Sequence, residues 1–177
     1  RCLWRSVVVS TFVSVGNAKQ PFRRLLDAVA RLAPRLPQPV IVQHGHTPFA
    51  CEHCQAVAFL GMGEFARRVA EAELLILHAG AGSVIHAIEA AKRPVVMPRR
   101  ADLGEHVNNH QLEFARVLGE TGRVVVVETP ERLEAAIAEA LVAANSAGAA
   151  PLAAQGELRM VKLVREALAD CARSLGK

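Results

Sequence analysis

Short apolar runs rich in Val, Ile and Leu recur along the chain, and turn-forming Gly and Pro residues separate them. Runs of this length without polar interruptions are typical of strands that are buried in a parallel sheet. We therefore expect strands at residues 7–15, 40–43, 56–60, 74–77, 94–97 and 123–127.

Segments with helical character alternate with these runs. We expect helices over residues 21–32 and 63–70, after the small-residue turn at residues 78–83, and over residues 106–118, where Leu112, Ala115 and Leu118 are the expected inward side chains. A further helix is expected to start at Thr129, with its hydroxyl as the cap and Pro130 in the first turn. This alternation predicts an α/β fold, a Rossmann-like open parallel sheet with helices on both faces, which binds ligands beyond the carboxyl ends of its strands.

The length of 177 residues favours one domain with a full core. We expect an N-terminal extension at residues 1–6, the domain proper at residues 7–144, and a linker with an amphipathic helix at residues 145–177. In that last helix, apolar residues recur at helical spacing from Leu158 to Leu168, beside Arg159, Lys162 and Arg165.

The segment from Leu74 to Arg99 combines a strand, a small-residue turn, a helix and a second strand. Glycines in the turn allow a ligand to approach the backbone, and the first N–H groups of a helix favour a phosphate or diphosphate. The segment lacks the third glycine of the dinucleotide fingerprint and the GK[ST] ending of a phosphate loop, so ATP or GTP hydrolysis is not expected. A tight turn without a ligand remains the alternative.

Polar and small residues follow each predicted strand. Because the strands are expected to be parallel, these segments should meet at one edge of the sheet and form one binding site. The segments are residues 16–17, 43–45, 60–62, 78–83 and 98–99.

Composition narrows the choice of partners and compartment. No apolar run approaches the ~20 residues that span a bilayer, residues 1–6 lack the features of a secretion signal, and four cysteines without a regular spacing suit a reducing cytoplasm. The formal net charge of +4 is dispersed and the chain has no tyrosine, which disfavours nucleic acid. A diphosphate ligand or an anionic membrane surface would account for the positive charge equally well.

A cluster of histidines and cysteines gives a second hypothesis for a site. It comprises His44, His46, Cys51, His53 and Cys54. These residue types bind zinc, but a second pair of ligands at suitable spacing is missing, so a variable loop is the main interpretation and no metal is expected. The Cys-x-x-Cys pair does not open a helix after a strand, which disfavours a thioredoxin-like role.

Four motifs in order, VSVGNAKQPFRRLL, VQHG, HAGAGSVIHAIEAAKRPVVMPR and GEHVNNHQLEFA, resemble the C-terminal domain of glycosyltransferase family 28. That domain also forms single-domain bacterial PssE-type proteins of exopolysaccharide synthesis, the catalytic subunit of the split Alg-type GlcNAc transferase, and the C-terminal half of MurG. The resemblance covers residues 7–127 and implies the donor-binding half of a GT-B glycosyltransferase, with a UDP-sugar as substrate.

The resemblance implies a role for residues in each motif. The diphosphate is expected at Gly16, Asn17, Gly80, Ala81, Gly82 and Ser83. The uridine is expected at Phe59, Leu60, Met62, His86 and Glu89; MurG-like members have a ribose-binding glutamate at the position of His86, so either His86 or Glu89 takes that role here. The sugar is expected at Gln43, Gly45, Glu105, Asn109, His110 and Gln111.

The chemistry implied is inverting hexosyl transfer to a lipid-linked saccharide acceptor, with UDP leaving. The helix N-terminus would stabilise the diphosphate, so no cofactor or metal ion is required. A general base removes the acceptor proton; His106 is the local candidate, and the partner is the other source. Because the acceptor half of a GT-B enzyme is not among these motifs, we expect a membrane-anchored PssD-like or Alg-type subunit and a peripheral, cytoplasmic membrane location. A nucleotide-sugar sensor without catalysis is the alternative.

Overall fold

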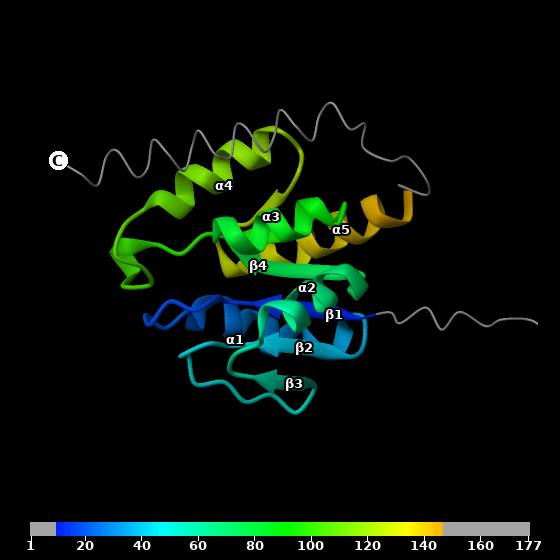
Figure 1. Cartoon of the computed structure of the whole chain (residues 1–177), viewed down its shortest axis with the longest axis horizontal. Coiled ribbons are helices and arrows are strands. Elements are labelled where there is room, and N and C mark those ends of the chain that lie inside the picture. Colours follow the sequence, from blue (N-terminus) through cyan, green and yellow to red (C-terminus); the bar gives the residue numbers. More distant parts are fainter. Residues whose placement is uncertain (1–9, 147–177) are drawn as a thin grey trace, which may run out of the picture.

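The computed structural model describes residues 10–146, the side chains of residues 145 and 146 excepted. The six strands are β1 (Thr11–Ser14), β2 (Val40–Gln43), β3 (Cys54–Val57), β4 (Leu74–His78), β5 (Val95–Met97) and β6 (Val125–Val126). All pairings are parallel, in the order β3-β2-β1-β4-β5-β6. The predicted open parallel sheet is therefore confirmed, and Figure 1 shows β4, β1, β2 and β3 side by side.

Within residues 10–146, five α-helices connect or follow the strands: α1 (Arg23–Leu32), α2 (Met62–Glu71), α3 (Ala81–Glu89), α4 (His110–Glu120) and α5 (Leu133–Ser146). The main cluster of buried side chains joins α1 and α5 to one face of the sheet. Two further clusters join α2, α3 and α4 to the other face. Both faces are covered, which explains why the central strands are apolar on both sides.

The carboxyl ends of the strands point to the left in Figure 1, where the loops after β1, β2 and β5 gather. The order of the strands reverses between β1 and β4, because the chain adds β2 and β3 on one side and continues with β5 and β6 on the other. Loops diverge at such a reversal and leave a crevice beyond the strand ends.

Three predicted boundaries are wrong. The third strand spans Cys54–Val57 rather than residues 56–60, because it is a half-exposed edge strand that lacks a long apolar run. The fourth helix begins at His110 rather than residue 106, since the preceding residues form a loop. The last strand contains only Val125 and Val126 of the predicted residues 123–127.

Two finer expectations also need correction. Thr129 makes no side-chain capping hydrogen bond, and a short 3₁₀ turn, Pro130–Arg132, precedes α5. In α4, Ala115 and Leu118 are buried as predicted, but Leu112 is only half-buried, because Gln111 and Phe114 occupy the inward positions beside them.

The expected final helix, the extension at residues 1–6 and most of the linker lie outside the described residues. Helix α5 continues to Ser146, within the predicted linker. Over residues 10–146, no helix is long and apolar enough to cross a bilayer.

Candidate functional site

A cavity of about 290 Å³ opens where the strand order reverses. Its wall contains parts of the loop after β1 (residues 15–22, the first loop), the end of β2, the segment before α2 and the start of α3. The loop after β2 (residues 44–53) is called the second loop. The cavity is lined by Ser14, Gly16, Asn17, Gln43, Leu60, Met62, Phe65, His78, Gly80, Gly82, Ser83 and His86. Nine of these twelve were predicted as ligand contacts from sequence: Gly16, Asn17, Gln43, Leu60, Met62, Gly80, Gly82, Ser83 and His86.

A chain of side-chain hydrogen bonds orders the loop that follows β1. The Ser14 hydroxyl donates to Gln43 Oε1 at 3.2 Å and accepts from the backbone N–H of Gly16 at 3.2 Å. Gln43 Nε2 donates to Asn17 Oδ1 at 3.4 Å. Gln43 is buried and makes one hydrogen bond to β1 and one to the loop after β1, while Asn17 is exposed.

The first and second loops touch at their glycines. Both Gly16 and Gly45 have positive φ angles, +73° and +57°, which favour glycine. A Cβ at Gly45 would lie 2.6 Å from the backbone oxygen of Gly16, so a side chain cannot be placed there without moving the loop. Gly45 therefore supports the first loop from behind and is absent from the cavity lining.

The start of α3 presents backbone N–H groups to the cavity. Gly80 is the N-cap residue and gives no side-chain cap, and the first hydrogen bond inside this turn runs from Val84 N–H to the Gly80 carbonyl. The N–H groups of residues 81–83 thus have no acceptor within the helix. Gly82 is exposed, with open space where a Cβ would lie. This turn can receive an anion at the positive end of the helix dipole.

His78 forms the floor of the cavity, and sequence analysis assigned it no specific role. Its ring fits against two glycines: a Cβ at Gly16 or Gly80 would lie 2.4 Å or 2.0 Å from His78 Nε2. Its Nδ1 donates to the Ser14 carbonyl oxygen at 3.3 Å. Burial, followed by the nearby charge of Arg99, lowers the pKa of His78 to about 4, so its ring is neutral at pH 7.

Two further lining residues, Ser14 and Phe65, were not predicted from sequence, for different reasons. Ser14 is the last residue of β1, and its polar side chain in an apolar strand was an available signal. Phe65 belongs to α2 and packs edge-on against Phe12, 5.5 Å between ring centroids, so it resembles an ordinary core residue in sequence.

The expected uridine contacts divide into two groups. Leu60, Met62 and His86 line the cavity, whereas Phe59 and Glu89 do not. Phe59 is 46% exposed and packs edge-on against His46. The Glu89 carboxylate lies 3.6 Å from His86 Nδ1, one turn farther along α3, and is exposed.

The expected sugar contacts of the GEHVNNHQ motif do not line this cavity. Glu105 is almost buried, with a side-chain exposure of 7%, and both carboxylate oxygens accept hydrogen bonds from Arg24 at 2.9 and 2.8 Å. Gln111 Oε1 accepts from the backbone N–H of Arg99, and Asn109 Oδ1 accepts from that of Ala101. These three side chains order the loop between β5 and α4.

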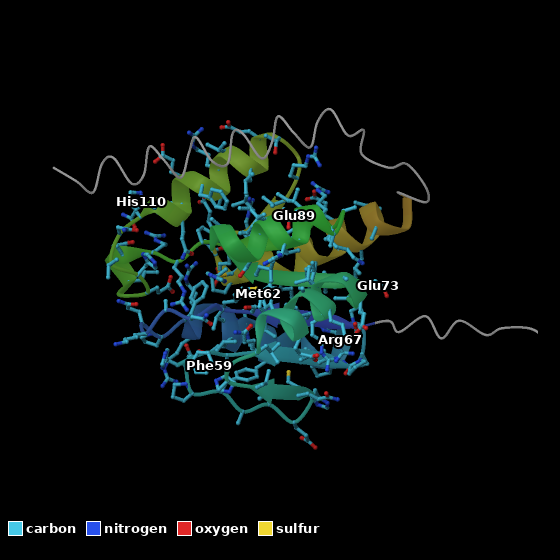
Figure 2. All side chains as sticks on the ribbon, in the orientation of Figure 1. Phe59, Met62, Arg67, Glu73, Glu89 and His110 are labelled. Atoms are coloured by element: carbon cyan, nitrogen blue, oxygen red, sulfur yellow. The ribbon has the colours of Figure 1, made fainter. Side chains whose placement is uncertain are left out.

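The two histidines of the motif are half-buried; His110 is the first residue of α4, and His106 lies in the loop before that helix. His106 Nδ1 and Asn108 Oδ1 are 3.1 Å apart, and Asn108 Oδ1 also accepts from the His110 N–H. His110 and Phe59 mark the two sides of the carboxyl-end face in Figure 2, with Met62 between them.

The histidine and cysteine cluster forms a turn at the sheet edge. Cys51 and Cys54 are free and half-buried, and the Cys54 N–H donates to the Cys51 carbonyl oxygen. Burial and the Cys51 thiol raise the pKa of Cys54 to about 12, so this thiol is protonated at pH 7. Among residues 10–146, no three His, Cys, Asp or Glu side chains are arranged to hold a metal ion.

Comparison with known proteins places these features in context. The family model described as the glycosyltransferase family 28 C-terminal domain matches residues 10–164. Among solved structures, the glycotransferase of kitacinnamycin has a TM-score of 0.61 at 18% identity, covering 96% of this chain and 41% of that chain. MurG of Acinetobacter baumannii has a TM-score of 0.49 at 22% identity, covering 88% and 49%. The chain thus spans less than half the length of both proteins, and no curated protein matches it.

Proposed function

Since the chain belongs to glycosyltransferase family 28, through the C-terminal domain that binds the nucleotide-sugar donor, we propose that it is the UDP-sugar-binding catalytic subunit of a two-component inverting glycosyltransferase. The observation that carries the proposal is the cavity at the reversal of strand order, where two glycine loops meet the N-terminus of α3. A diphosphate fits this position, because unpaired N–H groups and the helix dipole favour its charge.

In this proposal, three parts of the cavity bind the diphosphate, the uracil and the ribose of the donor. Ser83 and the amides of residues 81–83 bind the diphosphate together with Gly16 and Asn17. The uridine lies toward Leu60 and Met62. His86 takes the ribose contact, because it lines the cavity, and Glu89 orients the His86 ring from outside.

The sugar extends toward the loop between β5 and α4. There we assign the sugar contacts to Asn109, His110 and the amide nitrogen of Gln111, whose side-chain oxygen is already used. Glu105 orders this loop through Arg24, in place of the direct sugar contact expected from sequence. Gln43 and Gly45 act in the same indirect way, by holding the first loop.

The reaction follows from this placement. The acceptor hydroxyl attacks the anomeric carbon, the bond from that carbon to the diphosphate oxygen breaks, and UDP departs with the electron pair toward the α3 amides. A base removes the hydroxyl proton. His106 is the candidate on this chain; its replacement by alanine should lower kcat about 100-fold or more if it is the base, and change it little if the partner supplies the base.

The acceptor half is supplied by another protein in this proposal. The carboxyl-end face leaves the apolar side chains of Phe59, Met62, Leu103 and Val107 exposed, which supports a contact with another protein there. A PssD-like membrane subunit would cover this face and bring the lipid-linked saccharide, giving a peripheral location at the cytoplasmic membrane. Exopolysaccharide or glycan synthesis is the setting that we propose.

Calorimetry with UDP, UDP-glucose, UDP-galactose and UDP-GlcNAc tests donor binding. Ser83→Ala should weaken UDP about tenfold, the loss of one hydrogen bond to a charged group, ~1.5 kcal/mol. Thr121→Val, which removes a hydroxyl at the far end of α4, should leave the affinity unchanged. If the wild type and Ser83→Ala bind UDP with equal affinity, the assignment of the diphosphate to this turn is wrong.

A transfer assay separates the enzyme from a nucleotide-sugar sensor. The chain is co-expressed with a PssD-like subunit, and transfer of labelled hexose to membrane lipid is measured. Transfer that requires both proteins supports the enzyme. Tight binding of a UDP-sugar without transfer supports the sensor instead.

A further inference from the structure

Arg99 is a charged side chain that is fully buried directly after β5. Its Nη1 donates to the carbonyl oxygens of Gln20 and Glu105, at 2.8 and 2.9 Å, and its Nη2 donates to that of Val15 at 2.8 Å. The guanidinium carbon lies 4.7 Å from the centre of the Phe22 ring. Burial lowers the pKa of Arg99 to about 10, so the side chain keeps its positive charge at pH 7.

The three carbonyl acceptors belong to two different loops. Val15 and Gln20 are at the two ends of the loop that follows β1 and carries Gly16 and Asn17. Glu105 belongs to the loop between β5 and α4, which leads into the GEHVNNHQ motif. A single rigid guanidinium therefore fixes the separation of two loops that are far apart in sequence.

Neighbouring residues reinforce the same link. Arg24 binds the Glu105 carboxylate, and its guanidinium lies 5.5 Å from the Phe22 ring. The Phe22 N–H donates to the Thr47 hydroxyl, which attaches the loop between β2 and β3. Burying a charge is costly unless it is paired and hydrogen-bonded, so an apolar residue would suit a purely structural position better.

We propose that Arg99 is a positioning residue, which holds the first glycine loop and the loop between β5 and α4 at the spacing that a diphosphate and its attached sugar require. The inference rests on the proposed function, since it concerns the same donor site. Arg99 does not touch the donor; it acts through the backbone of Val15, Gln20 and Glu105.

Arg99 also contributes its charge to the cavity. None of the described residues that line the cavity is a lysine or arginine. The positive charge of Arg99 nevertheless reaches the cavity floor, where it is the second cause, after burial, of the low pKa of His78. The same charge would attract a diphosphate bound above that floor.

Two substitutions distinguish the effect of the hydrogen bonds made by Arg99 from the effect of its charge. Arg99→Lys keeps the charge and loses the planar fork, whereas Arg99→Met loses both. Arg93→Lys is the matched control: Arg93 stands before the same strand, at its opposite end, where it bonds Gly122 and Glu139 outside the site. Phe22→Leu loosens Arg99 without removing a buried charge.

Calorimetry of the full chain gives the dissociation constants for UDP and for the best-bound of UDP-glucose, UDP-galactose and UDP-GlcNAc. Arg99→Lys should weaken the UDP-sugar about tenfold more than it weakens UDP, and Phe22→Leu should act in the same direction by less. Arg99→Met should in addition weaken UDP about tenfold. Arg93→Lys should change neither constant by more than about twofold.

Amide hydrogen exchange of the same proteins gives a readout that does not depend on a ligand. In Arg99→Lys, exchange should rise about tenfold in residues 15–20 and 100–111 and stay unchanged in β1 and β4. Equal loss of protection throughout the domain would show that Arg99 is only a core residue and would overturn the proposal. Unchanged exchange and unchanged relative affinities in both Arg99→Lys and Phe22→Leu would overturn it as well.

Failure of the proposed function has a different outcome. If the wild-type chain binds none of the UDP-sugars, the donor assignment is wrong. In that case, selective loss of protection in the two loops still supports the link made by Arg99, and its absence refutes that link.

Discussion

Two glycines at the start of α3 should respond oppositely to alanine, although they are only two residues apart. A Cβ on Gly80 would lie 2.0 Å from His78 Nε2 and 2.8 Å from two ring carbons. Because His78 is buried, its ring cannot move aside freely, and we expect Gly80→Ala to destabilise the fold by about 1–3 kcal/mol, as other overpacked cores are. A Cβ on Gly82 meets nothing within 4 Å.

Gly82→Ala should therefore stabilise the fold by about 0.5–1 kcal/mol, because alanine loses less backbone entropy in a helix than glycine. In a protein of this size the melting temperature should rise by roughly 1–4 °C. The same methyl group would project into the space assigned to the diphosphate, so UDP should bind at least about tenfold more weakly, ~1.4 kcal/mol.

Thermal unfolding measures the stability of both variants, and calorimetry measures their affinity for UDP. A stable Gly82→Ala protein that binds UDP like the wild type would mean that the diphosphate does not lie on the α3 turn. A Gly80→Ala protein as stable as the wild type would mean that the His78 ring does not occupy the place described.

Three further predictions concern buried polar groups. The pKa of His78 is about 4, below its ordinary 6.5, so its contribution to the free energy of unfolding is complete above about pH 6.5. About 3 kcal/mol of that contribution is lost as the pH falls toward 4. Urea unfolding at a series of pH values should show this decrease in stability, and His78→Gln should abolish it. Glu105→Gln should lower the free energy of unfolding by about 3 kcal/mol, because it breaks a buried ion pair. Glu134→Gln, in an ion pair whose side chains are more than half exposed, should lower it by less than about 1 kcal/mol. Equal effects of the two substitutions would contradict the argument from burial. Gln111→Ala leaves the backbone N–H of Arg99 without its acceptor and should lower the free energy of unfolding by about 1–3 kcal/mol in the same assay. If the variant instead keeps full stability and loses UDP-sugar affinity, Gln111 contacts the ligand and has no structural role.

Local sequence patterns were enough to predict the fold class and much of the cavity wall. Strands β2 and β4 are continuous apolar runs and helix α1 has strong apolar periodicity, so the alternation of strands and helices could be predicted. A parallel sheet then brings every strand end to one edge, whatever the details of packing. Prediction of Gly16, Gln43 and Gly80 as neighbours in one site required no more than this, and all three line the cavity.

Other features depended on contacts between distant segments. Glu105 was expected to bind the sugar because it matches the family motif beside the sugar, but its partner Arg24 is 81 residues away and could not be inferred from spacing. The edge position of β3 likewise follows from pairing with β2, and it allows a strand without an apolar run.

The amino-acid sequence alone thus determined which segments become strands and helices and that their ends share one edge, because hydrophobic periodicity and glycine turns act over a few residues. Only the tertiary structure decided which polar side chains face the cavity and which, like Arg99, are used to hold its loops together. That choice depends on burial and on hydrogen-bond partners that are distant along the chain, such as Val15, 84 residues from Arg99, and no local pattern contains them.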